Sequence, residues 1–77
     1  MNGREIVKDI MSKAGKTNAE VAYSLGITQA AMWDRLNNKK TRDIPLSTLT
    51  EMLRVLGYKV VIVPRNAKTP QEGYNVE

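Results

Sequence analysis

Residues that could recognise a nucleic acid stand at the starts of two consecutive helical patterns. Thr17 and Asn18 open the first pattern, and Thr28 and Gln29 open the second. The Gln29 amide can donate a hydrogen bond to N7 of adenine and accept one from the N6 amino group, which matches an adenine edge in the major groove. In the alternative interpretation Gln29 only caps its helix or faces solvent. The hydroxyls and the amide at the two helix starts favour phosphate groups, which helix N-termini attract.

Three further residues of the second pattern complete the predicted DNA-facing surface. Ala30 offers a methyl group to thymine, or else is an ordinary exposed helix residue. Trp33 follows Gln29 by four positions and shares its face, where it could contact sugars or a thymine methyl. Packing in the core beside Met32 is the alternative for Trp33. Asp34 could accept a hydrogen bond from N4 of cytosine, but pairing with a neighbouring cation is the interpretation we favour.

A polar, basic segment follows the second pattern and is expected to contact the DNA backbone. Contacts with phosphates contribute affinity and register but carry no sequence information. A merely solvated loop is the alternative. The residues expected at phosphates in this segment are Asn37, Lys39, Lys40, Thr41 and Arg42, and those expected near the two helix starts are Lys16, Thr17, Asn18 and Thr28.

These side chains need two helices held at a fixed angle. Apolar residues recur at helical spacing on both sides of Gly26, a residue that adopts a positive φ at little steric cost. Two short helices that meet at a glycine are typical of a helix-turn-helix, which places its second helix in the DNA major groove. Two more amphipathic patterns flank the pair. The four expected helices cover residues 4–14, 18–25, 29–36 and 45–56.

The composition excludes several classes of site. The 77 residues include no cysteine and no histidine, which rules out disulfides, thiolate metal sites and histidine-based catalysis. We therefore expect no metal, no other cofactor and no enzymatic activity. The net charge of +4 and the pI of about 9.6 favour a polyanionic partner. The longest apolar run is too short for a membrane helix and no apolar signal segment follows the N-terminus, so we expect a cytoplasmic protein with no membrane partner.

Residues 58–64 differ from the rest of the chain because they are β-branched and aromatic and are bounded by Gly57 and Pro64. They predict a strand. We find no second strand pattern, and one strand cannot satisfy its own backbone donors and acceptors. A second copy of the strand across a two-fold axis would be its partner, and an extended tail packed on the fourth helix is the alternative. The residues expected at this dimer contact are Tyr58, Val60, Val61, Ile62 and Val63.

Three segments are therefore predicted along the chain. Residues 1–57 form a DNA-binding bundle, residues 58–64 form a dimerisation strand, and residues 65–77 form a polar tail without regular structure. In such a dimer the strand would set the spacing between the two DNA-facing helices. That spacing is about 34 Å for half-sites one DNA turn apart.

The stretch T-N-A-E-V-A-Y-S-L-G-I-T-Q-A-A-M-W-D-R-L-N-N, residues 17–38, has a spacing typical of one protein family. The residues that carry this spacing are Thr17, Glu20, Val21, Ala22, Leu25, Gly26, Ile27, Thr28, Gln29, Met32 and Asn37. With them, residues 3–57 resemble the Cro/repressor-type, or XRE-like, helix-turn-helix family, whose reading unit looks like T-Q-x-E-L-A-x-x-L-G-I-S-Q-x-x-V-S-x-x-x-N-G. The chain departs from that pattern at Asn18, Trp33 and Asn38, where glutamine, a small residue and glycine are usual.

The resemblance implies a mainly α, lambda-repressor-like bundle of four or five helices that binds a specific operator as a homodimer. It also implies that Gln29 contacts bases. Some members of the family end in a strand that pairs across the dimer, and residues 57–64 look like that variant. The fold we expect is therefore a helix-turn-helix bundle of four helices with one C-terminal β-strand that pairs with a second copy.

The expected function is a phage- or plasmid-like transcriptional repressor that binds a palindromic operator in double-stranded DNA. Two alternatives stay open. An antitoxin would bind DNA in the same way and would also bind a toxin protein through the tail or the first helix. A degenerate helix-turn-helix would act only in contacts between proteins, for which Trp33 and Asp34 are the best support.

Overall fold

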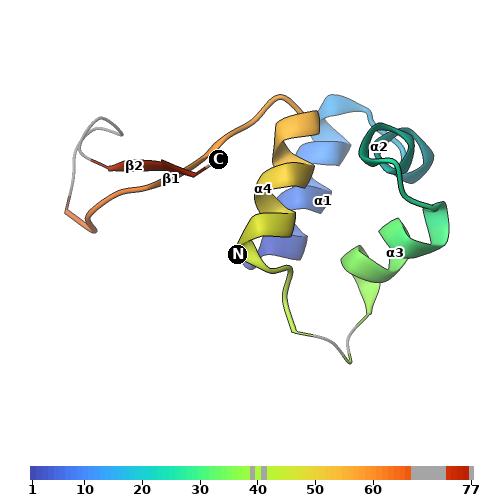
Figure 1. The fold of residues 1–77 in the computed structure, drawn as a ribbon, viewed down its shortest axis with the longest axis horizontal. Coiled ribbons are helices and arrows are strands. Elements are labelled where there is room, and N and C mark those ends of the chain that lie inside the picture. The colour runs from blue at the N-terminus through green and yellow to red at the C-terminus, as the bar shows by residue number, and fades with distance from the viewer. Residues whose placement is uncertain (39, 41, 67–72, 77) are drawn as a thin grey trace.

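The computed structural model describes residues 1–38, 40, 42–66 and 73–76. Within these residues four helices are followed by two short strands (Figure 1). The elements are α1 (Gly3–Ala14), α2 (Asn18–Leu25), α3 (Gln29–Asn37), α4 (Leu46–Val55), β1 (Val60–Ile62) and β2 (Tyr74–Val76). The mainly helical fold is confirmed. Each helix begins and ends within one residue of its expected bounds.

Local hydrogen bonds explain where α2 and α3 begin and end. The Thr17 hydroxyl accepts from the Glu20 N–H while the Glu20 carboxylate accepts from the Thr17 N–H, so the start of α2 is a capping box. The Thr28 hydroxyl accepts from the Ala31 N–H at 3.0 Å and caps α3. Between the helices Gly26 has a φ of 69°, in the left-handed region that favours glycine. The turn between α2 and α3 is thus set by Gly26, which ends α2, and Thr28, which begins α3.

The core forms where the four helices meet. Figure 1 shows α1 and α4 side by side, with α2 and α3 on one side of that pair. Val7 of α1, Met32 of α3 and Met52 of α4 are fully buried. Among the described residues, the buried apolar side chains are Val7, Met11, Val21, Ala22, Met32, Leu36, Ile44, Met52 and Leu53. Because α3 is anchored through Met32 and Leu36, its opposite face lies at the surface.

The strand predicted near residues 58–64 is present as β1, but its partner lies in the same chain. β1 pairs antiparallel with β2, with Val60 opposite Val76 and Ile62 opposite Tyr74. The predictions that the chain holds no second strand and that β1 needs a second copy to find a partner are therefore wrong. The alternative of an extended tail flat on α4 is wrong as well, because the strands project from the end of α4 as a hairpin (Figure 1). β2 was missed because three residues are too few for a periodic signal.

The prediction of a tail without regular structure fails for the segment that forms β2. Arg65 and Asn66 lie in a turn, and residues 67–72 and 77 lie outside the described residues. Gly73 makes the close pairing of β1 with the end of the chain possible, because a Cβ atom there would collide with the backbone carbonyl of Ile62. A glycine in a polar segment gives no local sign of this contact.

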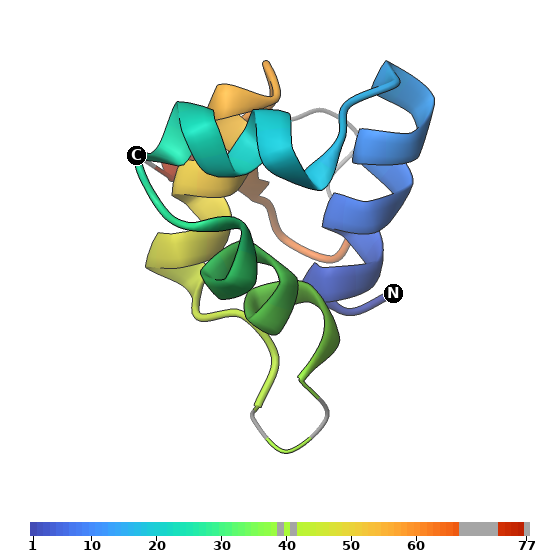
Figure 2. The ribbon, with the colours of Figure 1, turned by 90° about the vertical axis from the view of Figure 1, so that its right-hand side faces the viewer.

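The hairpin lies on the far side of the α1–α4 pair from α3. Figure 1 shows the hairpin and α3 at opposite ends of the molecule, and Figure 2 shows α2 and α3 in front with the hairpin behind them. Only Val60 of the hairpin packs against the core within the described residues. The outer face of α3 is consequently not covered by the hairpin.

Candidate nucleic-acid interface

The outward face of α3 carries Gln29, Ala30 and Trp33, which we call the reading face. Gln29 and Ala30 are exposed, and Trp33 is 59% exposed rather than packed in the core beside Met32. The spacing i, i+1 and i+4 places the three side chains on one side of the helix. Within the described residues neither the Gln29 amide nor the Trp33 indole N–H has a hydrogen-bond partner. Both groups are therefore available to a ligand.

Two other residues predicted for the DNA-facing surface are held by internal hydrogen bonds. Asp34 Oδ1 accepts from Asn38 Nδ2 at 2.9 Å, so within the described residues its partner is a neutral amide and not the cation we expected. Asn37 Nδ2 donates to the Trp33 carbonyl at 3.0 Å, and Asn37 Oδ1 accepts from Lys8 Nζ at 2.8 Å. These bonds occupy the C-terminal half of α3. The N-terminal half is the part of the helix whose outward side chains stay open.

The starts of α2 and α3 are joined to each other. Asn18 Nδ2 donates to the Gln29 carbonyl at 3.1 Å, which fixes the first residue of α3 against the first turn of α2. The Thr17 and Thr28 hydroxyls each accept from a backbone N–H of their own helix, and each hydroxyl proton can still be donated to a phosphate oxygen. The hydrogen bond from the Thr17 N–H holds the pKa of Glu20 below its ordinary value, which keeps this carboxylate charged near the start of α2.

Arg4 and Asp43 hold the segment after α3 against the start of α1, and the sequence predicted neither role. Arg4 Nε donates to the Arg35 carbonyl at 2.9 Å, and Arg4 Nη2 donates to the Arg42 carbonyl at 2.7 Å. Asp43 accepts from the Gly3 N–H at 2.6 Å and from the Arg4 N–H at 3.1 Å. The Gly3 N–H is the main reason that the pKa of Asp43 lies below its ordinary value. We call these four bonds the Arg4–Asp43 contacts.

The Arg4–Asp43 contacts position basic side chains beside the end of α3. Lys40 and Arg42 are exposed. Arg35 and Arg42 line one hollow of about 300 Å³ next to this end of the helix. Nothing in the sequence predicts that Arg35 and Arg42 line the same hollow. Lys39 and Thr41, which were predicted to contact phosphates, lie outside the described residues.

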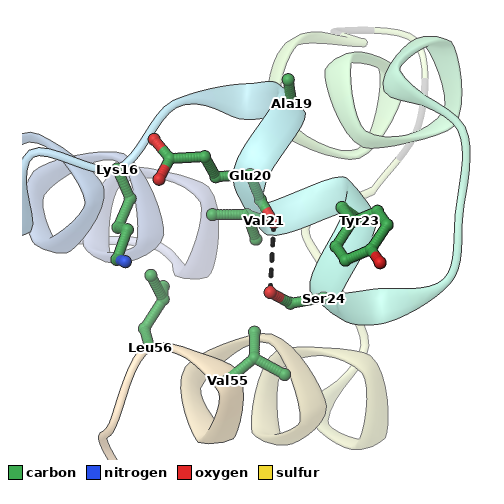
Figure 3. Close-up of a pocket in the computed structure, with 8 residues that line it drawn as sticks. All are labelled: Lys16, Ala19, Glu20, Val21, Tyr23, Ser24, Val55 and Leu56. Atoms are coloured by element: carbon green, nitrogen blue, oxygen red, sulfur yellow. Dashed lines mark hydrogen bonds between the residues drawn. The ribbon is translucent and has the colours of Figure 1, made fainter.

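Lys16 lies at a groove between α2 and the end of α4 (Figure 3). The groove has a volume of about 420 Å³, and its lining residues come from α2, α4 and the turns beside them. Figure 3 shows Lys16 and Leu56 at one end, Tyr23 at the other and Val55 directed into the space between the helices. Tyr23 is 88% exposed. Because this lining includes no residue of α3, the groove is separate from the reading face.

Other kinds of site find no support in the described part of the chain. No group of three or more acidic side chains there could hold a metal ion. None of the four helices is long and apolar enough to cross a bilayer. Comparisons with models of known protein families, with curated proteins and with solved structures find no match to this chain. Inference about its function therefore starts from the geometry of α3 and its surroundings.

Proposed function

We propose that this chain is a sequence-specific DNA-binding transcriptional regulator of the Cro/repressor, or XRE-like, type with a lambda-repressor-like fold. The observation that carries the proposal is the open reading face, Gln29, Ala30 and Trp33, on a helix anchored from behind by Met32 and Leu36. A helix held rigidly on a core with an outward face free of partners fits the major groove of B-DNA, which is about 12 Å wide.

Each part of the surface has its own role in this proposal. Gln29 reads adenine through its free amide. The starts of α2 and α3, with Thr17, Asn18 and Thr28, contact phosphates on one side of the groove. Lys40, Arg42 and their neighbours contact phosphates on the other side. The hydrogen bond from Asn18 to the Gln29 carbonyl keeps the phosphate-binding and base-reading parts in register.

The proposed regulator acts as a homodimer on a palindromic operator, and the hairpin forms the contact between the copies. Within the described residues β1 pairs only with β2, so one edge of β1 is open. A two-stranded hairpin is marginally stable alone in water, and Ile62 and Tyr74 are 50% and 75% exposed here. Pairing of the open β1 edges of two copies across a two-fold axis would give a four-stranded antiparallel sheet. This revises the predicted contact through residues 58 and 60–63, since each β1 strand then has one partner from each chain.

The dimer is tested by adding one lysine to each of the two β1 strands that would pair in that sheet. Ile62→Lys should shift the intact chain from dimer to monomer in sedimentation equilibrium, because like charges on paired strands destabilise the pair. Tyr23→Lys is the control, since it adds the same charge at an exposed aromatic residue of α2. A wild-type chain that stays monomeric at the highest soluble concentration would contradict the dimer.

DNA binding is tested by selecting duplexes from a random pool with the intact chain. We expect an inverted repeat whose half-sites lie one helical turn, about 34 Å, or a multiple of it apart. The affinity should fall as salt rises, because bound phosphates release counterions. A chain that binds no duplex at low salt contradicts the proposal and favours the alternative of a protein-interaction module. An antitoxin would also bind DNA in this test. A toxin that is encoded by a neighbouring gene and co-purifies with the chain would identify the chain as an antitoxin.

A further inference from the structure

The free part of the reading face is mostly apolar. Asp34 and Asn37 are engaged by internal hydrogen bonds, so within the described residues the open polar groups of this face are the Gln29 amide and the single indole N–H of Trp33. The other two outward residues of that half are Ala30 and Trp33, and Trp33 presents more than half of its surface. One amide can distinguish one base pair. Further base contacts from the N-terminal half of α3 therefore fall to Ala30 and Trp33.

The base edges in the major groove offer one apolar group, the 5-methyl of thymine. The other groups there are hydrogen-bond donors and acceptors, which an alanine methyl or an indole ring would cover without pairing. An uncompensated polar group is costly in a dry contact, so the apolar residues disfavour the other bases. Ala30 precedes Trp33 by three positions and therefore lies beside it on the helix. Together they form one apolar surface next to the Gln29 amide.

We propose that Ala30 and Trp33 contact the 5-methyl group of a thymine near the base pair that Gln29 reads, and that Trp33 determines this preference. The inference rests on the proposed function and names what the site selects. Each half-site of the operator would then hold an adenine at Gln29 and a thymine at Trp33. The indole ring offers the larger part of the contact, because aromatic side chains bury about 150–250 Å².

The experiment removes the methyl group and nothing else. Duplexes selected by the intact chain are prepared with each thymine in turn replaced by uracil, which lacks the methyl and keeps the hydrogen-bonding groups. The wild-type chain should lose about fourfold in affinity at one position of each half-site, the effect of leaving one methyl group unburied. Trp33→Ala should bind the thymine and uracil duplexes equally. Tyr23→Ala, which removes an exposed aromatic side chain of α2, should keep the fourfold difference.

5-Methylcytosine carries the same methyl group, so the duplex set also includes cytosine and 5-methylcytosine at that position. A gain on cytosine methylation that Trp33→Ala lacks identifies the methyl group itself as the ligand. A gain for thymine alone shows that O4 of thymine is part of the contact. No gain from the methyl on either base overturns the inference.

The possible failures are distinguishable. If no duplex is selected or bound, the proposed function fails. If duplexes are bound but uracil has no effect, or has the same effect in Trp33→Ala, the thymine assignment is overturned and DNA binding stands. Trp33 is exposed while Met32 and Leu36 anchor the helix, so the variant should fold, which circular dichroism checks. The uracil series with the wild-type chain decides the methyl contact even if the variant does not fold.

Discussion

Replacing Gln29 by alanine removes the amide that we assign to adenine and little else. The side chain is exposed, and its amide has no partner within the described residues. The Gln29 carbonyl, which accepts from Asn18, is part of the backbone and is retained. Alanine is the best helix former, so α3 should not be weakened. The change should therefore act on DNA binding and not on the fold.

The size of the effect follows from the two hydrogen bonds that the amide can make. A bidentate contact with a base contributes about 1–3 kcal/mol of discrimination, which is roughly 5- to 140-fold in affinity for each half-site. A dimer loses the contact in both half-sites, or about 2–6 kcal/mol in total. Binding to a scrambled duplex should be unchanged, because phosphate contacts do not depend on the amide.

Fluorescence anisotropy with a labelled operator and a scrambled duplex of the same length measures both quantities. Asn66→Ala is the matched control, since it removes an exposed amide from the turn after β1. The control should bind both duplexes like the wild type. An equal loss on the two duplexes for Gln29→Ala, or no loss on either, would refute a base-reading role for Gln29.

Three further predictions concern the core, the basic segment and the response to acid. Met32→Ala removes a fully buried side chain beneath α3 and should lower the free energy of unfolding by about 2–5 kcal/mol in urea denaturation; a change within 0.5 kcal/mol, the ordinary range for a surface site, would contradict its place in the core. Lys40→Ala and Arg42→Ala should each lower the slope of log affinity against log salt by about 0.9 per half-site, or about 1.8 for the dimer, and weaken operator and scrambled duplex alike, whereas a loss confined to the operator would point to base contacts. The pKa of Asp43 is lowered chiefly by the Gly3 N–H, so the stability from this bond is present at neutral pH and is lost as the pH falls below the ordinary carboxyl value of about 3.9. Asp43→Asn should therefore reduce the fall in thermal stability on acidification, and an unchanged pH profile would count against the Arg4–Asp43 contacts.

The helical bundle could be predicted because its signals are local. The capping box of Thr17 and Glu20, the cap at Thr28 and the left-handed turn at Gly26 involve residues at most five positions apart. Apolar spacing then identifies the residues that face the core, such as Met32 and Leu36. Each of these features is visible in a short window of sequence.

The hairpin and the Arg4–Asp43 contacts could not be predicted because they join distant segments. β2 is three residues long, and its pairing depends on Gly73 coming close to the backbone of Ile62. The partners of Arg4 and Asp43 lie 31 to 40 positions away. Periodicity and capping patterns do not predict such contacts. From the sequence alone, a charged residue such as Arg4 would be expected to face solvent.

The residues of the reading face could be named from helical spacing, but their availability could not. Spacing alone groups Asp34 and Asn37 with Gln29 and Trp33 as candidates. The structure separates them, because Asp34 and Asn37 are engaged by hydrogen bonds inside the bundle. Which polar groups are free depends on neighbours from α1 and the segment after α3, and therefore on tertiary structure.

The most direct measurement is a two-dimensional ¹⁵N–¹H NMR titration of the intact chain with the selected operator. We expect the largest shift changes at residues 28–33 and at Lys40 and Arg42, with the Trp33 indole N–H among them. Amides at the end of α4, those of Arg54 and Val55, should change little. A titration that leaves residues 28–33 unchanged while the operator binds elsewhere would contradict the assignment of α3 as the helix that reads DNA.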